Sequence, residues 1–119
     1  MRTVLIVEDE WAIADWLEVL LSENGYNVLS AGNGREALDI LHREMPDLVL
    51  TDFMMPFIDG AGLIAAMKDN PATRHIPVVM MTSLLESVVR ERVVGYRAYL
   101  RKPFREADLM KVVGEILEK

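Results

Sequence analysis

The chain alternates two kinds of segment, and this alternation restricts its fold more than any other feature of the sequence. Short apolar runs of strand length are separated by longer stretches in which apolar residues recur at helical spacing. The predicted strands are Val4–Val7, Val28–Ser30, Leu48–Leu50, Val78–Met81 and Ala98–Leu100. Strands that alternate with helices require right-handed crossovers and a parallel sheet covered on both faces. The sequence therefore predicts an α/β fold.

The predicted helices begin and end at recognisable signals. The first carries an apolar stripe from Ile13 to Leu21 and stops at Asn24-Gly25, a helix C-terminal pair. The second helix begins at Asn33 and is closed by Pro46. The third starts after Asp59-Gly60, and the fourth runs from Ser83-x-x-Glu86 to Gly95. The fifth carries an apolar stripe from Leu109 to Leu117 and runs to the C-terminus. Asn33 and Glu36 form a pattern that resembles a capping box.

Composition limits the functions open to the chain. Its 119 residues fit a single domain over positions 1–119, and no linker or repeat marks a boundary. There is no run of membrane-spanning length and no signal-peptide pattern at the start, so we expect a cytoplasmic protein without a membrane partner. The absence of Cys excludes thiol catalysis and thiolate metal sites. A net charge of −6 argues against direct nucleic acid binding.

Polar residues follow the carboxyl ends of four predicted strands. In an open parallel sheet, ligands bind at this edge. The residues expected there are Glu8-Asp9-Glu10, Asp52, Thr82-Ser83 and Lys102-Pro103. The sequence thus predicts a site with several carboxylates, a hydroxyl and an ammonium.

Each of these residues also has an ordinary structural interpretation. Asp9 or Glu10 can cap a helix, and Asp52 can be a turn residue. Lys102 can be a solvated lysine, and Thr82 a plain strand end. These interpretations leave the gathering of like charges unexplained, since each carboxylate raises the cost of ionising the others. A magnesium ion would resolve that conflict, because Mg²⁺ prefers carboxylate oxygens and bridges readily to a phosphoryl group.

Taken together, these motifs resemble the receiver domain of bacterial two-component response regulators. The resemblance rests on Val4-Leu5-Ile6-Val7 before Glu8-Asp9, on the segment from Asp47 to Pro56 with Asp59-Gly60, on Thr82-Ser83, and on Tyr99-Leu-Arg-Lys102-Pro103-Phe104. It covers essentially the whole chain. It implies a doubly wound, flavodoxin-like domain of five strand–helix units, with a five-stranded sheet in the order 2-1-3-4-5. The stretch Gly95-Tyr96-Arg97-Ala98 departs from the small and acidic residues usual in the family.

The resemblance also implies a chemistry. Asp52 would accept a phosphoryl group from a histidine kinase or a phosphotransfer protein. Glu8, Asp9, Asp52 and the backbone carbonyl of Met54 would hold Mg²⁺, and Thr82 and Lys102 would contact the phosphoryl oxygens. Tyr99 would report the state of Thr82 to a face made by the fourth helix, the fifth strand and the fifth helix.

The output partner implied is a downstream effector or an output domain, and the resemblance allows a homodimer that forms on phosphorylation. Such a domain is a signalling module rather than an enzyme with a separate substrate. It catalyses only its own phosphorylation and dephosphorylation.

Three other functions compete with this interpretation. An aspartyl phosphohydrolase typically has a second Asp two residues after the first, where this chain has Met54. A flavin-binding module needs a phosphate cradle after the first strand, where Glu8-Asp9-Glu10 would repel a phosphate. The intact acidic set argues against a receiver that has lost its chemistry and serves only for docking.

Overall fold

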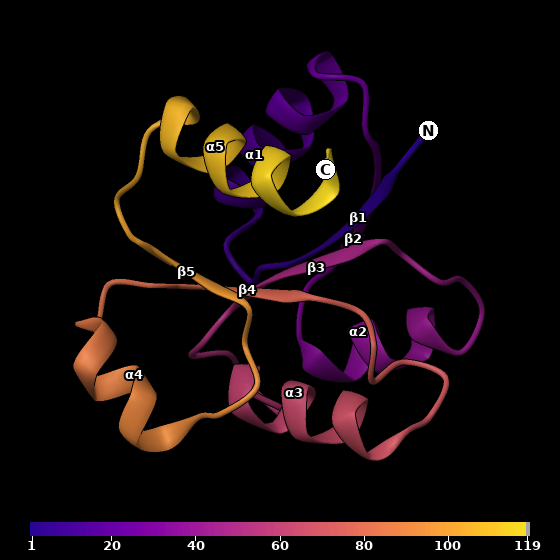
Figure 1. The fold of residues 1–119 in the computed structure, drawn as a ribbon, viewed down its shortest axis with the longest axis vertical. Helices are drawn as coiled ribbons and strands as arrows, with labels where there is room; N and C mark the ends of the chain where they lie inside the picture. The colour runs from indigo at the N-terminus through magenta and orange to yellow at the C-terminus, as the bar shows by residue number, and fades with distance from the viewer. Residues whose placement is uncertain (119) are drawn as a thin grey trace.

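Five parallel strands form one sheet with helices on both faces (Figure 1). The computed structural model describes residues 1–118. The strands are β1 (Thr3–Val7), β2 (Asn27–Ala31), β3 (Leu48–Asp52), β4 (Val78–Thr82) and β5 (Ala98–Arg101). The helices are α1 (Trp11–Glu23), α2 (Gly34–Leu41), α3 (Gly60–Asp69), α4 (Glu86–Arg92) and α5 (Glu106–Leu117).

The strand order is β2-β1-β3-β4-β5, which confirms the predicted topology. Val4 of β1 pairs with Val28 of β2 on one side and with Leu48 of β3 on the other. β4 lies between β3 and β5, with Val79 opposite Ala98. All five residues of β3 and of β4 are buried. Their apolar runs are followed by buried polar residues at the carboxyl ends, Thr51 and Asp52 in β3 and Thr82 in β4.

The sheet separates two hydrophobic cores. α1 and α5 cover one face, and α2, α3 and α4 cover the other (Figure 1). Leu17 and Leu109 belong to the core under α1 and α5, whereas Leu63 and Val89 belong to the opposite core. Within residues 1–118, none of the helices combines the length and the hydrophobicity that crossing a bilayer requires.

Some predicted helix boundaries were wrong. α2 was expected to be closed by Pro46 but already ends at Leu41, and both boundaries of α4 differ from the prediction. The helix was expected to start near Ser83 and to end at Gly95, but it starts at Glu86 and ends at Arg92. Leu85, not Ser83, is its N-cap residue, and Val93 already has extended backbone angles. Val93 is buried in the core, and a continued helix would turn the chain away from β5. Tertiary packing therefore ends the helix before the glycine signal. The predicted extension of the last helix to the C-terminus falls partly outside the described residues.

The start of α3 lies directly against the end of β3. The Gly60 N–H donates to the Phe53 carbonyl at 2.7 Å. A Cβ atom on Gly60 would lie 2.5 Å from the Asp52 carbonyl oxygen and 3.0 Å from the Phe53 Cα. Only glycine allows this close approach, which fixes the backbone at Asp52.

We therefore expect Gly60→Ala to destabilise the fold, because the new methyl group would meet backbone atoms that cannot move aside. Overpacking of this kind typically costs about 1–3 kcal/mol. Gly114→Ala is the matched control, since nothing lies within 4 Å of its Cβ position inside α5. That variant should gain about 0.5–1 kcal/mol from helix propensity. Urea unfolding of both variants checks the pair, and equal effects of the same sign would contradict the packing argument.

Candidate functional site

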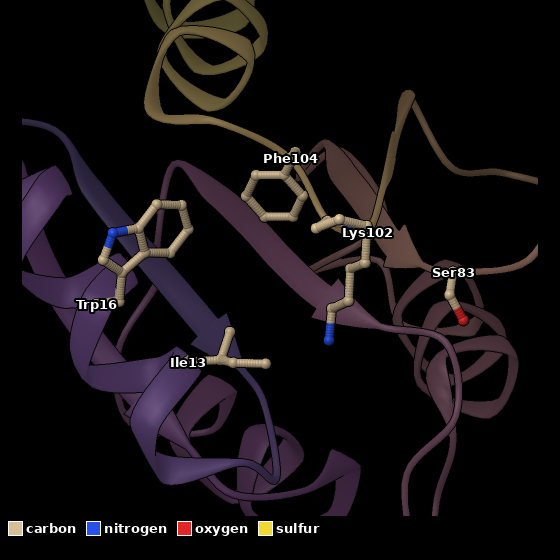
Figure 2. A pocket seen from close by; sticks show the side chains of 6 residues that line it. Ile13, Trp16, Ser83, Lys102 and Phe104 are labelled. Carbon is tan, nitrogen blue, oxygen red and sulfur yellow. The ribbon is translucent and has the colours of Figure 1, made fainter.

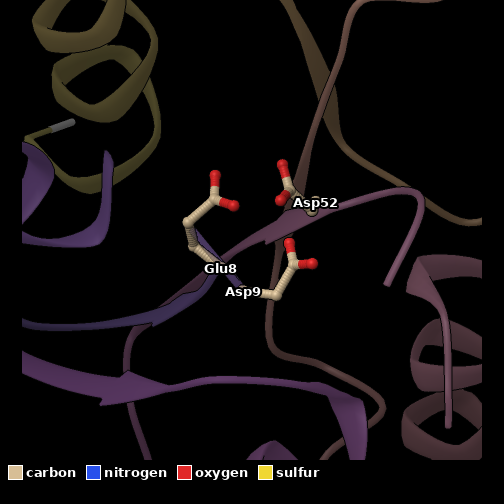
Figure 3. A group of neighbouring side chains, drawn as sticks. All are labelled: Glu8, Asp9 and Asp52. Carbon is tan, nitrogen blue, oxygen red and sulfur yellow. The ribbon is translucent and has the colours of Figure 1, made fainter. Parts of the chain in front are cut away.

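Three carboxylates meet at the carboxyl edge of the sheet (Figure 3). Glu8 follows β1, Asp9 is the next residue, and Asp52 ends β3. One oxygen from each lies within 4.8 Å of the others. Glu8 is 2% exposed and Asp52 is 5% exposed, while Asp9 is open to solvent. The fold thus gathers residues that are more than forty positions apart in the sequence.

The Lys102 ammonium lies between two of these carboxylates. Its Nζ atom is 2.8 Å from Glu8 Oε1 and 2.5 Å from Asp52 Oδ1. The side chain extends from the loop after β5 toward this edge of the sheet, as Figure 2 shows. The Lys102–Pro103 peptide bond is cis. The sequence analysis expected this ammonium at the same edge of the sheet as the carboxylates, and it lies there.

The site has an unbalanced charge. Burial raises the pKa of Asp52 to about 8, and the neighbouring Glu8 carboxylate adds to that rise. Burial also opposes ionisation of Glu8, but hydrogen bonds with Asp52 and Lys102 outweigh it, so the pKa of Glu8 is lowered. Burial alone would lower the pKa of Lys102, yet its contacts with Asp52 and Glu8 raise it. Asp52 therefore gives up its proton less readily than an ordinary aspartate carboxyl.

The residues present fit a hard divalent cation. Asp52 Oδ1 is buried and forms no hydrogen bond of acceptable geometry, although the Lys102 ammonium lies near it. The donors are carboxylate oxygens, which Mg²⁺ prefers. A cation would compensate the repulsion between Asp52 and Glu8 and would engage the unbonded oxygen.

Thr82 is joined to Tyr99 through one residue of the loop after β4. The Leu84 N–H donates to Thr82 Oγ1 at 3.2 Å. The Tyr99 hydroxyl in turn donates to the Leu84 carbonyl. The two hydrogen bonds hold the peptide groups on either side of the Leu84 Cα, so this residue links Thr82 to Tyr99. Ser83 does not cap α4 and is exposed.

Met54 lies beside the carboxylate cluster on the loop after β3. Its side chain is 67% exposed. It lines a cavity of about 350 Å³ together with Asp9, Met55, Pro56 and Asp59.

The sequence analysis missed an apolar cavity on the other side of Lys102. The cavity has a volume of about 350 Å³ and is lined by Ile13, Trp16, Ser83, Lys102, Pro103 and Phe104 (Figure 2). The Trp16 and Phe104 rings contact each other with centroids 5.8 Å apart. Trp16 is 40% exposed, and an exposed Trp on a helix face is the signal that could have pointed to this surface.

Comparison with known proteins identifies the family to which this fold and this site belong. The sequence profile of the response regulator receiver domain matches residues 4–114. The chain therefore belongs to the response regulator receiver domain family.

Two curated relatives and two solved structures illustrate the likeness. "Probable transcriptional regulator ycf27" of Guillardia theta is 38% identical over 98% of this chain and 45% of its own length. "Probable transcriptional regulator ycf29" of Pyropia yezoensis is 31% identical over 98% of this chain and 53% of its own. The chain thus spans about half the length of these relatives.

Among solved structures, a signal receiver domain of a histidine kinase from Syntrophus aciditrophicus is 36% identical, with a TM-score of 0.92 over 99% of this chain and 91% of its own. The receiver domain of a sensor histidine kinase from Pseudomonas aeruginosa PAO1 is 26% identical, with a TM-score of 0.91 over 99% of this chain and 98% of its own. That structure has a magnesium ion coordinated in its active-site cleft.

The raised pKa of Asp52 should make magnesium binding depend on pH. Between about pH 4 and pH 8, a carboxyl with the raised pKa of Asp52 keeps its proton in the folded state more readily than in the unfolded chain. Without magnesium, Asp52 therefore lowers the stability of the fold as the pH rises through this range. Bound Mg²⁺ requires the carboxylate, and its affinity should rise by up to roughly tenfold per pH unit below pH 8 and then level off. The increase in melting temperature on adding magnesium, measured from pH 6 to pH 9, checks this.

Asp9→Ala is the companion variant for this measurement, because Asp9 is exposed and has no ion pair among the described residues. It should lose most of the magnesium-dependent increase. A magnesium effect that is equal at pH 6 and pH 9, or unchanged in Asp9→Ala, would contradict the ligand set.

Proposed function

We propose that Asp52 is the phosphoacceptor of this receiver domain. The observation that carries the proposal is the buried Asp52 Oδ1, which lacks a hydrogen bond and lies beside the Lys102 ammonium and two further carboxylates. Asp52 thus offers an oxygen without a hydrogen bond beside a positive charge. Neither Glu8, which is bonded to Lys102 and the Glu10 N–H, nor the exposed Asp9 offers this combination.

The phosphodonor proposed is the phosphohistidine of a histidine kinase or of a phosphotransfer protein, acting in the cytoplasm. An Asp52 carboxylate oxygen forms a new bond to phosphorus as the bond between phosphorus and the histidine nitrogen breaks. The histidine leaves with the electron pair of that bond, and the product is an acyl phosphate on Asp52. The domain would thus catalyse only its own phosphorylation and the later hydrolysis. The apolar cavity beside Lys102 offers a contact area for the donor protein.

The other residues would position the phosphoryl group and compensate its charge. Glu8, Asp9, Asp52 and the carbonyl of Met54 would hold the cation. Bound Mg²⁺ would neutralise charge on the phosphoryl oxygens during transfer. Lys102 would move from its pair with Asp52 to a phosphoryl oxygen, and the Thr82 hydroxyl would donate to another.

The output would follow from that movement of Thr82. When its hydroxyl turns to the phosphoryl oxygen, the Leu84 N–H loses the acceptor that it has at 3.2 Å. The loop before α4 then changes, and with it the peptide group to which Tyr99 donates. The face formed by α4, β5 and α5 would therefore differ between the two states, which is a shift in population between conformations. The partner that reads this face would be a downstream effector or an output domain, or a second copy of the chain.

Asp52→Asn should abolish labelling by acetyl phosphate in the presence of magnesium, because an amide oxygen is a poor nucleophile and cannot form the acyl phosphate. Intact-protein mass spectrometry checks this by the mass of one phosphoryl group. The matched control is Asp59→Asn on the same loop, where the Asp59 side chain accepts from the Gly62 N–H and an amide can do the same. That variant should be labelled like the parent. Full labelling of Asp52→Asn would contradict the assignment.

A further inference from the structure

Tyr96 lies in the stretch where the sequence departs from the small and acidic residues usual in the family. It belongs to the connection between α4 and β5, which Figure 1 shows returning from the end of α4 to the sheet. The Tyr96 ring is partly buried and packs against the core under α2, α3 and α4. An alanine or an aspartate at this position would offer neither the ring nor a hydroxyl donor.

The Tyr96 hydroxyl ties this connection to the start of α4. It donates to Glu86 Oε2 at 3.3 Å. Glu86 is the first residue of α4 and Arg92 is the last, so the hydrogen bond closes a loop that contains the whole helix. The chain turns directly before Tyr96 at Gly95, whose φ of 97° lies in the left-handed region that glycine adopts readily.

Few other contacts hold α4 in place. Val89 is its one buried residue within residues 1–118, and the N-cap residue Leu85 forms no side-chain cap. Arg90 is 3.6 Å from Glu86 Oε1, but this ion pair lies inside the helix. In the part of the chain that the structure describes, no other hydrogen bond or ion pair joins an α4 side chain to the rest of the domain. The contact between Tyr96 and Glu86 is therefore the polar side-chain link that attaches α4.

This link lies close to the path that leads from the carboxylate site to Tyr99. Glu86 is two residues after Leu84, whose carbonyl accepts from the Tyr99 hydroxyl. The Glu86 carboxylate is also near enough to affect that hydroxyl, because burial raises the pKa of Tyr99 and the negative charge of Glu86 adds to the rise. A change at Leu84 therefore occurs two residues from the carboxylate that Tyr96 holds.

We propose that Tyr96 is a positioning residue, which holds α4 in its present place through Glu86 and opposes the movement of α4 that phosphorylation of Asp52 would cause. The inference rests on the proposed function for that movement, but not for the attachment of α4 itself. The loss of one partly exposed hydrogen bond to a carboxylate changes a conformational equilibrium by roughly five- to tenfold. Because coupling between sites is reciprocal, a bond that breaks when α4 moves weakens the binding of a phosphoryl mimic at Asp52 by up to the same factor.

The test removes only the hydroxyl, in Tyr96→Phe. Amide hydrogen exchange of α4 is measured, together with the affinity for beryllofluoride, a mimic of the phosphoryl group, at constant magnesium. We expect α4 amides to exchange roughly five- to tenfold faster and beryllofluoride to bind more tightly by up to the same factor. Tyr96→Phe should have no further effect in a Glu86→Ala background, where the hydroxyl has no carboxylate to meet. The matched control is Tyr26→Phe, which removes a hydroxyl that donates to the Glu118 carboxylate on the other face of the sheet and should leave α4 unchanged.

The outcomes separate this inference from the proposed function. Unchanged α4 exchange in Tyr96→Phe, an equal change in Tyr26→Phe, or an undiminished effect in the Glu86→Ala background would overturn the attachment of α4 through this bond. Faster exchange without tighter binding of beryllofluoride would overturn the opposition to the movement. The exchange measurement is repeated in Asp52→Asn, where the same acceleration is expected without any bound mimic. Failure of beryllofluoride to bind the parent would thus contradict the proposed function, while the exchange data would still decide whether Tyr96 holds α4.

Discussion

Repulsion among carboxylates at one edge of the sheet is the constraint on which the rest of this structure depends. Glu8 and Asp52 are buried side by side because β1 and β3 are neighbours whose carboxyl ends coincide. A single ammonium, that of Lys102, compensates them and leaves Asp52 with a raised pKa. β3 and β4 are buried along their whole length and hold the backbone in place. The Glu8 and Asp52 carboxylates therefore stay close together in spite of their repulsion. A site of this kind gains stability when a cation binds to the native state.

The same edge of the sheet connects the site to the surface around β5. Thr82 ends β4, and the path from its hydroxyl to Tyr99 passes through the single residue Leu84. α4 is held weakly, since Val89 is its one buried residue within residues 1–118. A short helix with one anchor can shift at low cost when the loop before it changes.

The sequence predicts the sheet, its helices and the members of the carboxylate cluster because each depends on local patterns. Continuous apolar runs identify β3 and β4, and their ends identify Asp52 and Thr82. The C-terminal end of α4 could not be predicted, because burial of Val93 overrides the glycine signal at Gly95. The cavity formed by Trp16 and Phe104 was also missed, since it brings together residues from α1 and the loop after β5.

The most direct test of this account is whether a phosphoryl mimic at Asp52 changes the amide shift of Tyr99. Amide shifts of the parent on adding beryllofluoride with magnesium should extend from Asp52 through Thr82 and Leu84 to Tyr99 and α4. Tyr99→Phe, which removes the hydroxyl that donates to the Leu84 carbonyl, should retain the shifts near Asp52 and weaken those in α4. Shifts confined to the loops around Asp52 in the parent would contradict the coupling between the site and this surface.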